Sequence, residues 1–436
     1  AWLRTRRFWV QILVSAPTST MTYSNKFKLI IFFSFLLKLT FILFFHEKGL
    51  SDEWLILFKN YLNNKSYSYY IFDGRYIPSS YMPPLYLFFL YFSKIISLDM
   101  FNFLYVTYFF QLLLSTFSVY LFFYICRNFF NKNYSLFGAL IFSIFPLLVY
   151  SNALVSSATL QLFLYLFFFK LYLDLLNGNK NVFKLVCLIF VSSACLLLRG
   201  EFLIILLFSI IYLVVINKKM ISFAIILIVC SFLITSPYII RNFMNTGKIH
   251  IVNVSGYALW KGNNHLAKVE GFHNSLHPNQ NKSWPKVDEF KNLYKKLNNV
   301  PKNNKYEINR DEVFKKEAIN NIFSDKKKYF KLYLKKLISY FFIDINSTLK
   351  NYYHPAHIYP LIIFSFMSLP GFLIGIKKFR NSKIVYIFLI TGLLTFLISS
   401  FFILPRYKIS IISFQILSSL FFIEYLIKIF KKEKKI

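Results

Sequence analysis

Two adjacent acids, Asp52 and Glu53, are the residues of this chain whose type and position best suit chemistry. They stand in a polar, aromatic segment, residues 46–84, that separates two apolar runs. A carboxylate held at a membrane surface can act as a general base, and a connecting segment this long and aromatic is a common place for function. Asp52 has a structural alternative, because it would also cap a helix running to Tyr61. Glu53 is better explained as an acid in the first turn of that helix, or as a residue that supports Asp52, than as the general base itself.

The composition indicates that membrane helices position these acids. The chain of 436 residues is 56% hydrophobic and 21% aromatic, with a mean hydropathy of +0.50. These apolar residues far exceed the needs of a soluble core, so we expect a polytopic membrane protein. The net charge of +33 would suggest nucleic acid in a soluble protein, but here the lysines accompany many Phe, Ile and Asn residues, as an A- and T-rich coding bias produces. We therefore expect no nucleic-acid partner. The four cysteines lie in or beside apolar runs and form no disulfide framework or CxxC pattern.

Ten apolar runs have roughly the 20-residue length that a bilayer crossing requires. They are residues 29–45, 103–126, 134–150, 154–175, 182–198, 202–216, 221–240, 358–376, 384–404 and 409–427. We therefore expect an all-α polytopic membrane protein with about ten transmembrane helices. Residues 1–20 show no pattern that continues downstream, whereas Met21 opens a basic flank before the first run. We expect residues 1–20 to be a non-native or mis-started leader.

Whether a shorter apolar run, residues 85–98, crosses the membrane decides on which side of it every later loop lies. If it stays at the interface without crossing, the short basic loops and both termini fall on one side, which the positive-inside rule makes cytoplasmic. Residues 46–102 and 241–357 then lie together on the outer face. The expected organisation is a transmembrane module over residues 21–240, an extracytoplasmic loop domain over residues 241–357, and C-terminal helices with a basic tail over residues 358–436.

The loop domain, between the seventh and eighth predicted crossings, is expected to be a small mixed lid. Residues 249–254 are rich in β-formers and precede a glycine-containing loop. From Asp311 to Phe342, apolar residues recur at helical spacing among lysines. This pattern is typical of amphipathic juxtamembrane helices on a membrane surface.

Four short motifs stand in a fixed order along the chain. They are Asp52 with Glu53 after the first run, Pro83 to Tyr86 at the entry to the short run, Pro237 to Asn242 followed by Leu259 to Asn264, and Arg406, Tyr407 and Lys408 near the end. Together they resemble the GT-C superfamily, the integral-membrane glycosyltransferases of the protein mannosyltransferase and aminoarabinose transferase type. The resemblance covers residues 27–427.

The resemblance implies transfer of a sugar, hexosyl or pentosyl, from a polyprenyl-phosphate carrier with inversion at the anomeric carbon. The acceptor would be an envelope glycan, lipid or protein on the outer face of a bacterial cytoplasmic (inner) membrane. Phosphate is a good leaving group and needs no general acid, whereas the acceptor hydroxyl needs a base. The resemblance gives that role to Asp52.

A departing lipid phosphate also needs fixed cations close to the bilayer. By the predicted topology, Arg199, Arg241, Arg406 and Lys408 stand at the outer ends of helices. The resemblance favours Arg406 with Tyr407 as the phosphate clamp, and Arg241 next. The alternative for each arginine is an interfacial anchor whose stem lies along apolar surface.

The resemblance also assigns sugar or acceptor contacts to Trp260, Asn263, Asn264 and Tyr81. Aminoarabinose-type relatives carry a glutamate just before the proline-started helix, where this chain has Ser80 to Pro83. That departure argues against a bound metal, so no cofactor is expected and a divalent ion is the one alternative left open.

Two rival functions remain from the sequence. An O-antigen-type ligase or polymerase would also work outside on a lipid-linked donor, but with a long glycan on a diphosphate. A transporter or flippase for a lipid-linked sugar would show internal repeats and polar residues at mid-membrane. Apart from the site, Lys170 with Asp174 and Glu424 with Lys428 stand four apart near helix ends and predict ion pairs.

Overall fold

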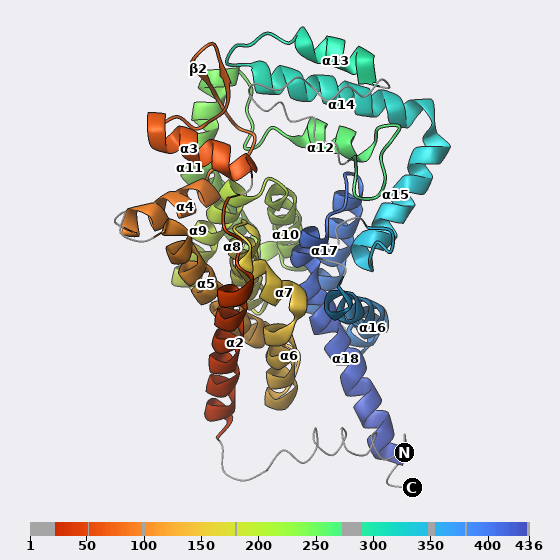
Figure 1. The fold of residues 1–436 in the computed structure, drawn as a ribbon. Helices are drawn as coiled ribbons and strands as arrows, with labels where there is room; N and C mark the ends of the chain where they lie inside the picture. Colours follow the sequence, from red (N-terminus) through yellow and green to blue (C-terminus); the bar gives the residue numbers. More distant parts are fainter. Residues whose placement is uncertain are drawn as a thin grey trace.

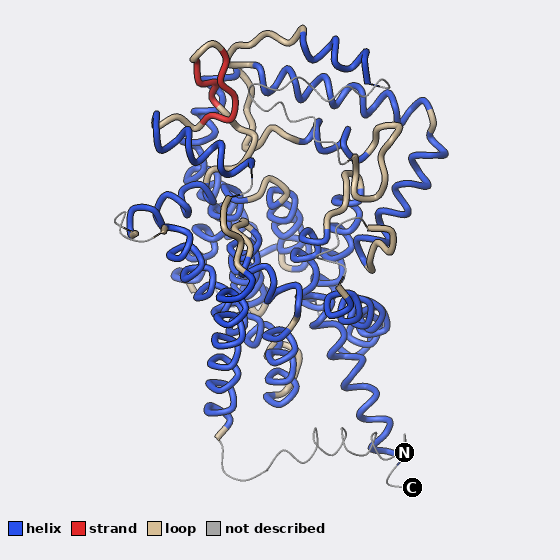
Figure 2. Tube along the Cα trace, viewed as in Figure 1, coloured by secondary structure: helices blue, strands red, loops and turns tan. Residues whose placement is uncertain are grey.

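The computed structural model describes residues 22–50, 52–97, 102–178, 181–272, 290–347, 354–379 and 382–433. Helices make up nearly all of this part of the chain, together with one two-stranded sheet. Figure 1 shows a bundle of long helices with a layer of shorter helices across one end, and Figure 2 shows the hairpin in that layer. The expected all-α class is confirmed.

Seven helices of the described part are long and apolar enough to cross a membrane. They are α2 Tyr23–Phe45, α5 Phe103–Cys126, α8 Ala158–Leu176, α11 Ile221–Thr246, α16 Pro355–Phe379, α17 Ser382–Ser399 and α18 Ile409–Glu433. A bent pair, α6 Lys132–Ile144 with α7 Pro146–Tyr150, forms an eighth candidate with an angle of 52°. The bend follows from Pro146, because the residue before a proline avoids the helical conformation and Phe145 is extended.

The predicted count of ten crossings is not confirmed. Two of the ten runs form shorter helices, α9 Val182–Leu198 of 17 residues and α10 Phe202–Ile216 of 15 residues. The short run after the prolines forms α4 Leu85–Ile96, which lies across the direction of α2 in Figure 1. A helix of 12 residues is too short to cross the hydrocarbon core of a bilayer, which is about 30 Å thick. This length suits a helix that lies at the membrane interface.

The segment between α2 and α4 folds into α3 Asp52–Asn64 and a hairpin of β1 Ser68–Phe72 with β2 Arg75–Pro78. Asp73 and Gly74 form the two-residue turn, both with positive φ (47° and 76°). Such a turn matches the twist of paired strands, and Asp-Gly is a preferred sequence for it. The hairpin was not predicted from the sequence, although this signal was present.

The lid is built from α12 Ser255–Gly262, α13 Lys291–Asn298, α14 Tyr306–Ser324 and α15 Lys326–Phe341. The stretch from Asp311 to Phe342 is helical as predicted, while the place of these helices on a membrane surface stays a prediction. The predicted strand over residues 249–254 is wrong, since this stretch has no ladder partner and Asn253 N makes one backbone hydrogen bond, to Ser80 O. In the described part of the lid the only β-pairing is an isolated bridge between Lys268 and Gly271, so a mixed lid is not observed there.

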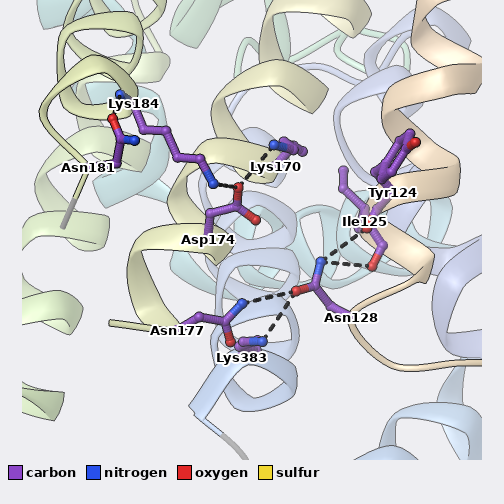
Figure 3. Close-up of polar contacts among 9 residues, drawn as sticks. All are labelled: Tyr124, Ile125, Asn128, Lys170, Asp174, Asn177, Asn181, Lys184 and Lys383. Atoms are coloured by element: carbon purple, nitrogen blue, oxygen red, sulfur yellow. Dashed lines mark hydrogen bonds and ion pairs between the residues drawn. The ribbon is translucent and has the colours of Figure 1, made fainter. Parts of the chain in front are cut away.

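A polar network joins the helix ends remote from the lid. Lys170 and Lys184 both contact Asp174 Oδ2, at 2.9 and 2.7 Å, and join α8 to α9. Figure 3 shows Asn128, just after α5, receiving hydrogen bonds from Asn177 and Lys383 in the same region. The predicted pair of Lys170 with Asp174 is confirmed, and Lys428 likewise lies 2.8 Å from Glu424.

Candidate active site

Glu53 and Tyr81 bring the start of α3 next to the segment that precedes α4. The Tyr81 hydroxyl donates to Glu53 Oε1 over 3.5 Å, and its ring stacks on Tyr69 with centroids 5.2 Å apart. Burial, with a further contribution from the Glu53 charge, raises the pKa of Tyr81 well above its usual value, so this hydroxyl stays a donor. The backbone of α3 begins at Asp52, whose side chain lies outside the described residues.

Helix α12 adds Tyr257 and Lys261, which share a helix face because they are four residues apart. Burial lowers the pKa of Lys261, while Glu53 raises it and Arg406 lowers it. The pKa of Tyr257 is raised by burial and also by Glu53. Lys261 is therefore within electrostatic reach of both a carboxylate and a guanidinium. Its Nζ lies 4.6 Å from the centre of the Phe402 ring.

Arg406 and Arg199 approach the same place from two other helix ends. Arg406 is exposed in the turn η5 Pro405–Lys408, with its guanidinium 5.9 Å from the Tyr407 ring. Tyr407 interacts electrostatically with Arg406, Arg199 and Glu53. Arg199 follows α9, and its Nε donates to Gln161 Oε1 over 3.0 Å. We call Glu53, Lys261, Arg199 and Arg406 the charged cluster.

Arg241 and Lys408, which were predicted to bind the donor phosphate, donate hydrogen bonds to backbone carbonyls in the structure. Arg241 donates to the carbonyls of Ser79 and Tyr67, and its guanidinium lies 5.5 Å from the centre of the Tyr67 ring. It thereby holds the end of the hairpin. Lys408 is buried and donates to the carbonyls of Phe341 and Phe342, which closes the C-terminal end of α15.

Three residues predicted to contact the sugar are packed or hydrogen-bonded inside the lid or between the lid and the end of α17. Trp260 is 1% exposed and packs against Phe290 and Phe314 in the lid core. Asn264 Nδ2 donates to the carbonyls of Trp260 and Lys261, while Asn263 Nδ2 donates to those of Leu259 and Ser400. Buried amides need such partners, so these asparagines shape the loop that carries Lys261.

The joint between lid and hairpin was missed by sequence reasoning. Glu307 of α14 is buried and accepts hydrogen bonds from Ser79 Oγ and from the backbone and hydroxyl of Ser80. Burial raises the pKa of Glu307 to about 7. His250 contacts Ser80 Oγ through Nε2 at 2.9 Å. No local pattern reveals this joint, because the partners are far apart in sequence.

Lys261 and Tyr257 were also missed, although a signal existed. Lys261 lies inside the Leu259 to Asn264 motif and Tyr257 lies two residues before it, and their spacing of four places them on one face of any helix there. Within the described ranges, no three His, Cys, Asp or Glu side chains group closely enough to hold a metal ion.

Comparisons with known proteins support the fold. No protein-family model and no curated protein sequence matches this chain. The archaeal oligosaccharyltransferase AglB from Archaeoglobus fulgidus, solved with an inhibitory peptide and a dolichol-phosphate, is similar in structure, with a TM-score of 0.55 and 13% identity over 94% of this chain. The apo form of the Archaeoglobus fulgidus oligosaccharyltransferase gives a TM-score of 0.52 and 10% identity over 92% of this chain.

The chain spans about half the length of both solved structures, 51% and 50% respectively. At such low identity the likeness concerns the fold alone. It agrees with the four sequence motifs, which lie on α3, on the entry to α4, on α11 with α12, and on η5. The chain therefore shares its overall fold with these two oligosaccharyltransferase structures, a likeness in line with the GT-C resemblance of its motifs.

Proposed function

We propose that this chain is a membrane glycosyltransferase that moves a sugar from a polyprenyl-phosphate carrier to a hydroxyl acceptor, on the lid side of the bundle. The observation that carries the proposal is the charged cluster, where Glu53, Lys261, Arg199 and Arg406 converge from four separate elements. Such a cluster at the end of a membrane bundle suits a reaction in which a proton leaves and a phosphate anion departs.

In the proposed reaction, the acceptor oxygen forms a bond to the anomeric carbon while the bond from that carbon to the phosphate oxygen breaks. Asp52 takes the proton of the acceptor hydroxyl, and attack from the side opposite the phosphate inverts the anomeric configuration. Glu53, on the next residue of α3, positions the site through Tyr81. Arg406 and Lys261 stabilise the negative charge that remains on the lipid phosphate.

This assignment favours Arg406 over the other predicted cations. Arg406 is exposed beside the cluster, whereas the contacts of Arg241 and Lys408 are to backbone carbonyls of the hairpin and of α15. Arg199 takes a supporting part, since it lies 3.9 Å from Glu201 and is bonded to Gln161. The proposed location is a cytoplasmic membrane with the lid outside.

A transfer assay tests the function. The purified chain in liposomes receives a panel of polyprenyl-phosphate sugars with a radiolabel in the sugar, and label in glycan, lipid and protein fractions is counted. For at least one donor of the panel, the radiolabel should move from the donor lipid to an acceptor fraction. A diphosphate-linked oligosaccharide in a parallel reaction tests the ligase or polymerase alternative.

Two matched variants separate chemistry from folding. Asp52→Asn should abolish transfer, whereas Asp73→Asn changes an exposed aspartate in the hairpin turn and should leave it intact. Asparagine tolerates the positive φ at position 73, so the control keeps its turn. Transfer by Asp52→Asn at the rate of the unchanged chain would remove Asp52 from the mechanism.

A further inference from the structure

One stripe of helix α8 is partly exposed although most of this helix is buried. The half-buried side chains that precede Leu176 are Phe163, Phe167, Lys170 and Asp174. Their spacings of four, three and four residues place them on one face of the helix. Because α8 is long and apolar enough to cross the membrane, this face meets lipid.

The charged end of this stripe carries more positive than negative charge. Lys170 Nζ of α8 and Lys184 Nζ of α9 lie 2.9 and 2.7 Å from the same oxygen, Asp174 Oδ2. Figure 3 shows the two ammonium groups meeting at this carboxylate. A third lysine, Lys383 of α17, interacts electrostatically with Asp174. Three ammonium groups around one carboxylate leave an excess positive charge that attracts an anion.

Both lysines of the ion pair can still reach an added anion. The exposed fractions of their side chains are 26% for Lys170 and 31% for Lys184. An ammonium group has three donors, and each of these two gives one to Asp174. Partly buried cations at the edge of a bilayer are costly unless anions accept their other hydrogen bonds. A phosphate oxygen is a strong acceptor of that kind.

The apolar end of the stripe suits a hydrocarbon chain. The rings of Phe163 and Phe167 have their centroids 5.9 Å apart and form a half-buried aromatic surface on the same face as Lys170. Lys170 stands six residues before the end of α8 at Leu176, which is about 9 Å along the helix axis. A lysine side chain at that depth extends its ammonium group to the headgroup region. The stripe therefore offers cations at headgroup depth and aromatic surface at the depth of acyl chains.

We propose that this stripe binds one anionic phospholipid of the leaflet remote from the lid, with its phosphate at Lys170 and Lys184 and an acyl chain along Phe167 and Phe163. The occupant is a phospholipid and not a free phosphate ion, because the cations and the aromatic surface share one continuous face of α8. The phosphate bridges a lysine from each of two helices, so the bound lipid holds α8 and α9 together. The site is remote from the lid, so the inference does not rest on the proposed sugar transfer.

Photolabelling tests the site directly. The purified full chain is reconstituted with phosphatidylglycerol that carries a diazirine in one acyl chain, and the labelled peptides are mapped by mass spectrometry. Labels should appear in residues 163–176 of α8 and 182–190 of α9. Phosphatidylcholine with the same diazirine should label these residues no more than about a fifth as strongly, because its headgroup carries no net charge.

One matched pair of variants separates this site from general surface charge. Lys184→Gln removes one cation, while its amide can still donate to Asp174. It should weaken labelling by phosphatidylglycerol about fivefold, as expected for the loss of one lysine beside an acidic headgroup. Lys219→Gln removes the same charge from an exposed lysine of the turn η2 Lys218–Met220 and should leave the labelling unchanged. An equal fall in both variants would overturn the assignment.

A neutral network gives a second readout. The combined variant Lys170→Gln, Asp174→Asn and Lys184→Gln keeps three polar side chains of similar size and leaves no carboxylate without its lysines. Phosphatidylglycerol should raise the thermal midpoint of the unchanged chain relative to phosphatidylcholine, and this variant should lose that rise. Labels absent from both helices, labels equally strong with the phosphatidylcholine probe, or displacement of the labels by inorganic phosphate alone would overturn the inference.

Discussion

Glu307 Oε2 lies 2.7 Å from the backbone nitrogen of Ser80, although 227 positions separate the two residues in the chain. This contact joins α14 of the lid to the segment that follows the β-hairpin. Tyr81, the next residue after Ser80, donates to Glu53 of the charged cluster. A movement of the lid would therefore displace Tyr81.

The first prediction concerns the pH dependence of lid docking. Burial raises the pKa of Glu307 to about 7 from an ordinary value of 4.5, so the docked state holds this proton more tightly than the undocked state. The stabilisation is fully present below pH 4.5 and is lost as the pH rises through 7. The amide hydrogens of the Tyr306–Ser324 helix should have larger protection factors, that is, slower exchange relative to the intrinsic rate at the same pH, at pH 5 than at pH 8.

Glu307→Gln isolates this group. A neutral amide oxygen can still accept from Ser80 N and does not titrate, so the variant should show similar protection factors at both pH values. The pKa of His250 is lowered, first by its own burial, so its effect on docking has the opposite sign and lies at lower pH. An unchanged pH profile in Glu307→Gln would show that another group controls docking.

The second prediction concerns the base. Asp52→Asn should lower turnover by about a hundredfold or more, as expected for loss of a general base. Asparagine can still cap α3, so expression and thermal stability should not change. Glu53→Gln should have a smaller effect on turnover, because it removes the charge near Tyr81 and Lys261 but not the proposed base. A larger loss in Glu53→Gln than in Asp52→Asn would exchange the two roles.

The third prediction concerns the phosphate cation. Arg406→Ala should raise the KM for the donor more than that for the acceptor, because in the proposed mechanism the guanidinium binds the lipid phosphate. Arg406→Lys should restore binding only in part, since an ammonium cannot make the two-pronged contact. Arg75→Ala, an exposed arginine of β2, is the control. Donor and acceptor KM values that rise together would reduce Arg406 to an interfacial anchor.

The fourth prediction distinguishes Arg241 from Arg406. Removing the Arg241 guanidinium leaves the Ser79 carbonyl without its side-chain donor and leaves the Tyr67 carbonyl with Ser79 N alone, at a cost of about 1–3 kcal/mol. Arg241→Ala should therefore lower the thermal midpoint in detergent and increase proteolysis at the hairpin. The donor KM of the folded fraction should stay near that of the unchanged chain, and a selective rise in that KM would return Arg241 to the phosphate site.

The fifth prediction concerns topology. In a cysteine-free background, single cysteines replace Asn64, Lys219 and Asn303, all exposed in the structure. A membrane-impermeant thiol reagent applied to intact cells should label the first and third but not the second. Opposite outcomes for Asn64 and Asn303 would mean that α3 and the lid do not share a compartment, which would end the proposed site.

The sequence alone determined the features that depend on local pattern. Apolar runs of sufficient length became α2, α5, α8 and α18, because a backbone in lipid must satisfy its hydrogen bonds within one segment. The spacing of Lys170 and Asp174 predicted their ion pair for a similar reason, since residues four apart meet on a helix. Pro83 and Pro84 marked the start of α4 correctly. The GT-C resemblance rested on short motifs of this kind.

Only the tertiary structure decided which polar residues of those motifs face a shared site. Asn264 and Lys408 had the residue types expected for sugar and phosphate, but the fold buries both against backbone carbonyls. Lys261 was given no role from the sequence, yet it is within electrostatic reach of both Glu53 and Arg406. The burial of a side chain depends on elements that are distant in the chain, as for Lys408, whose partner Phe341 is 67 positions away. A single sequence carries the type of each side chain but not the distance between two of them.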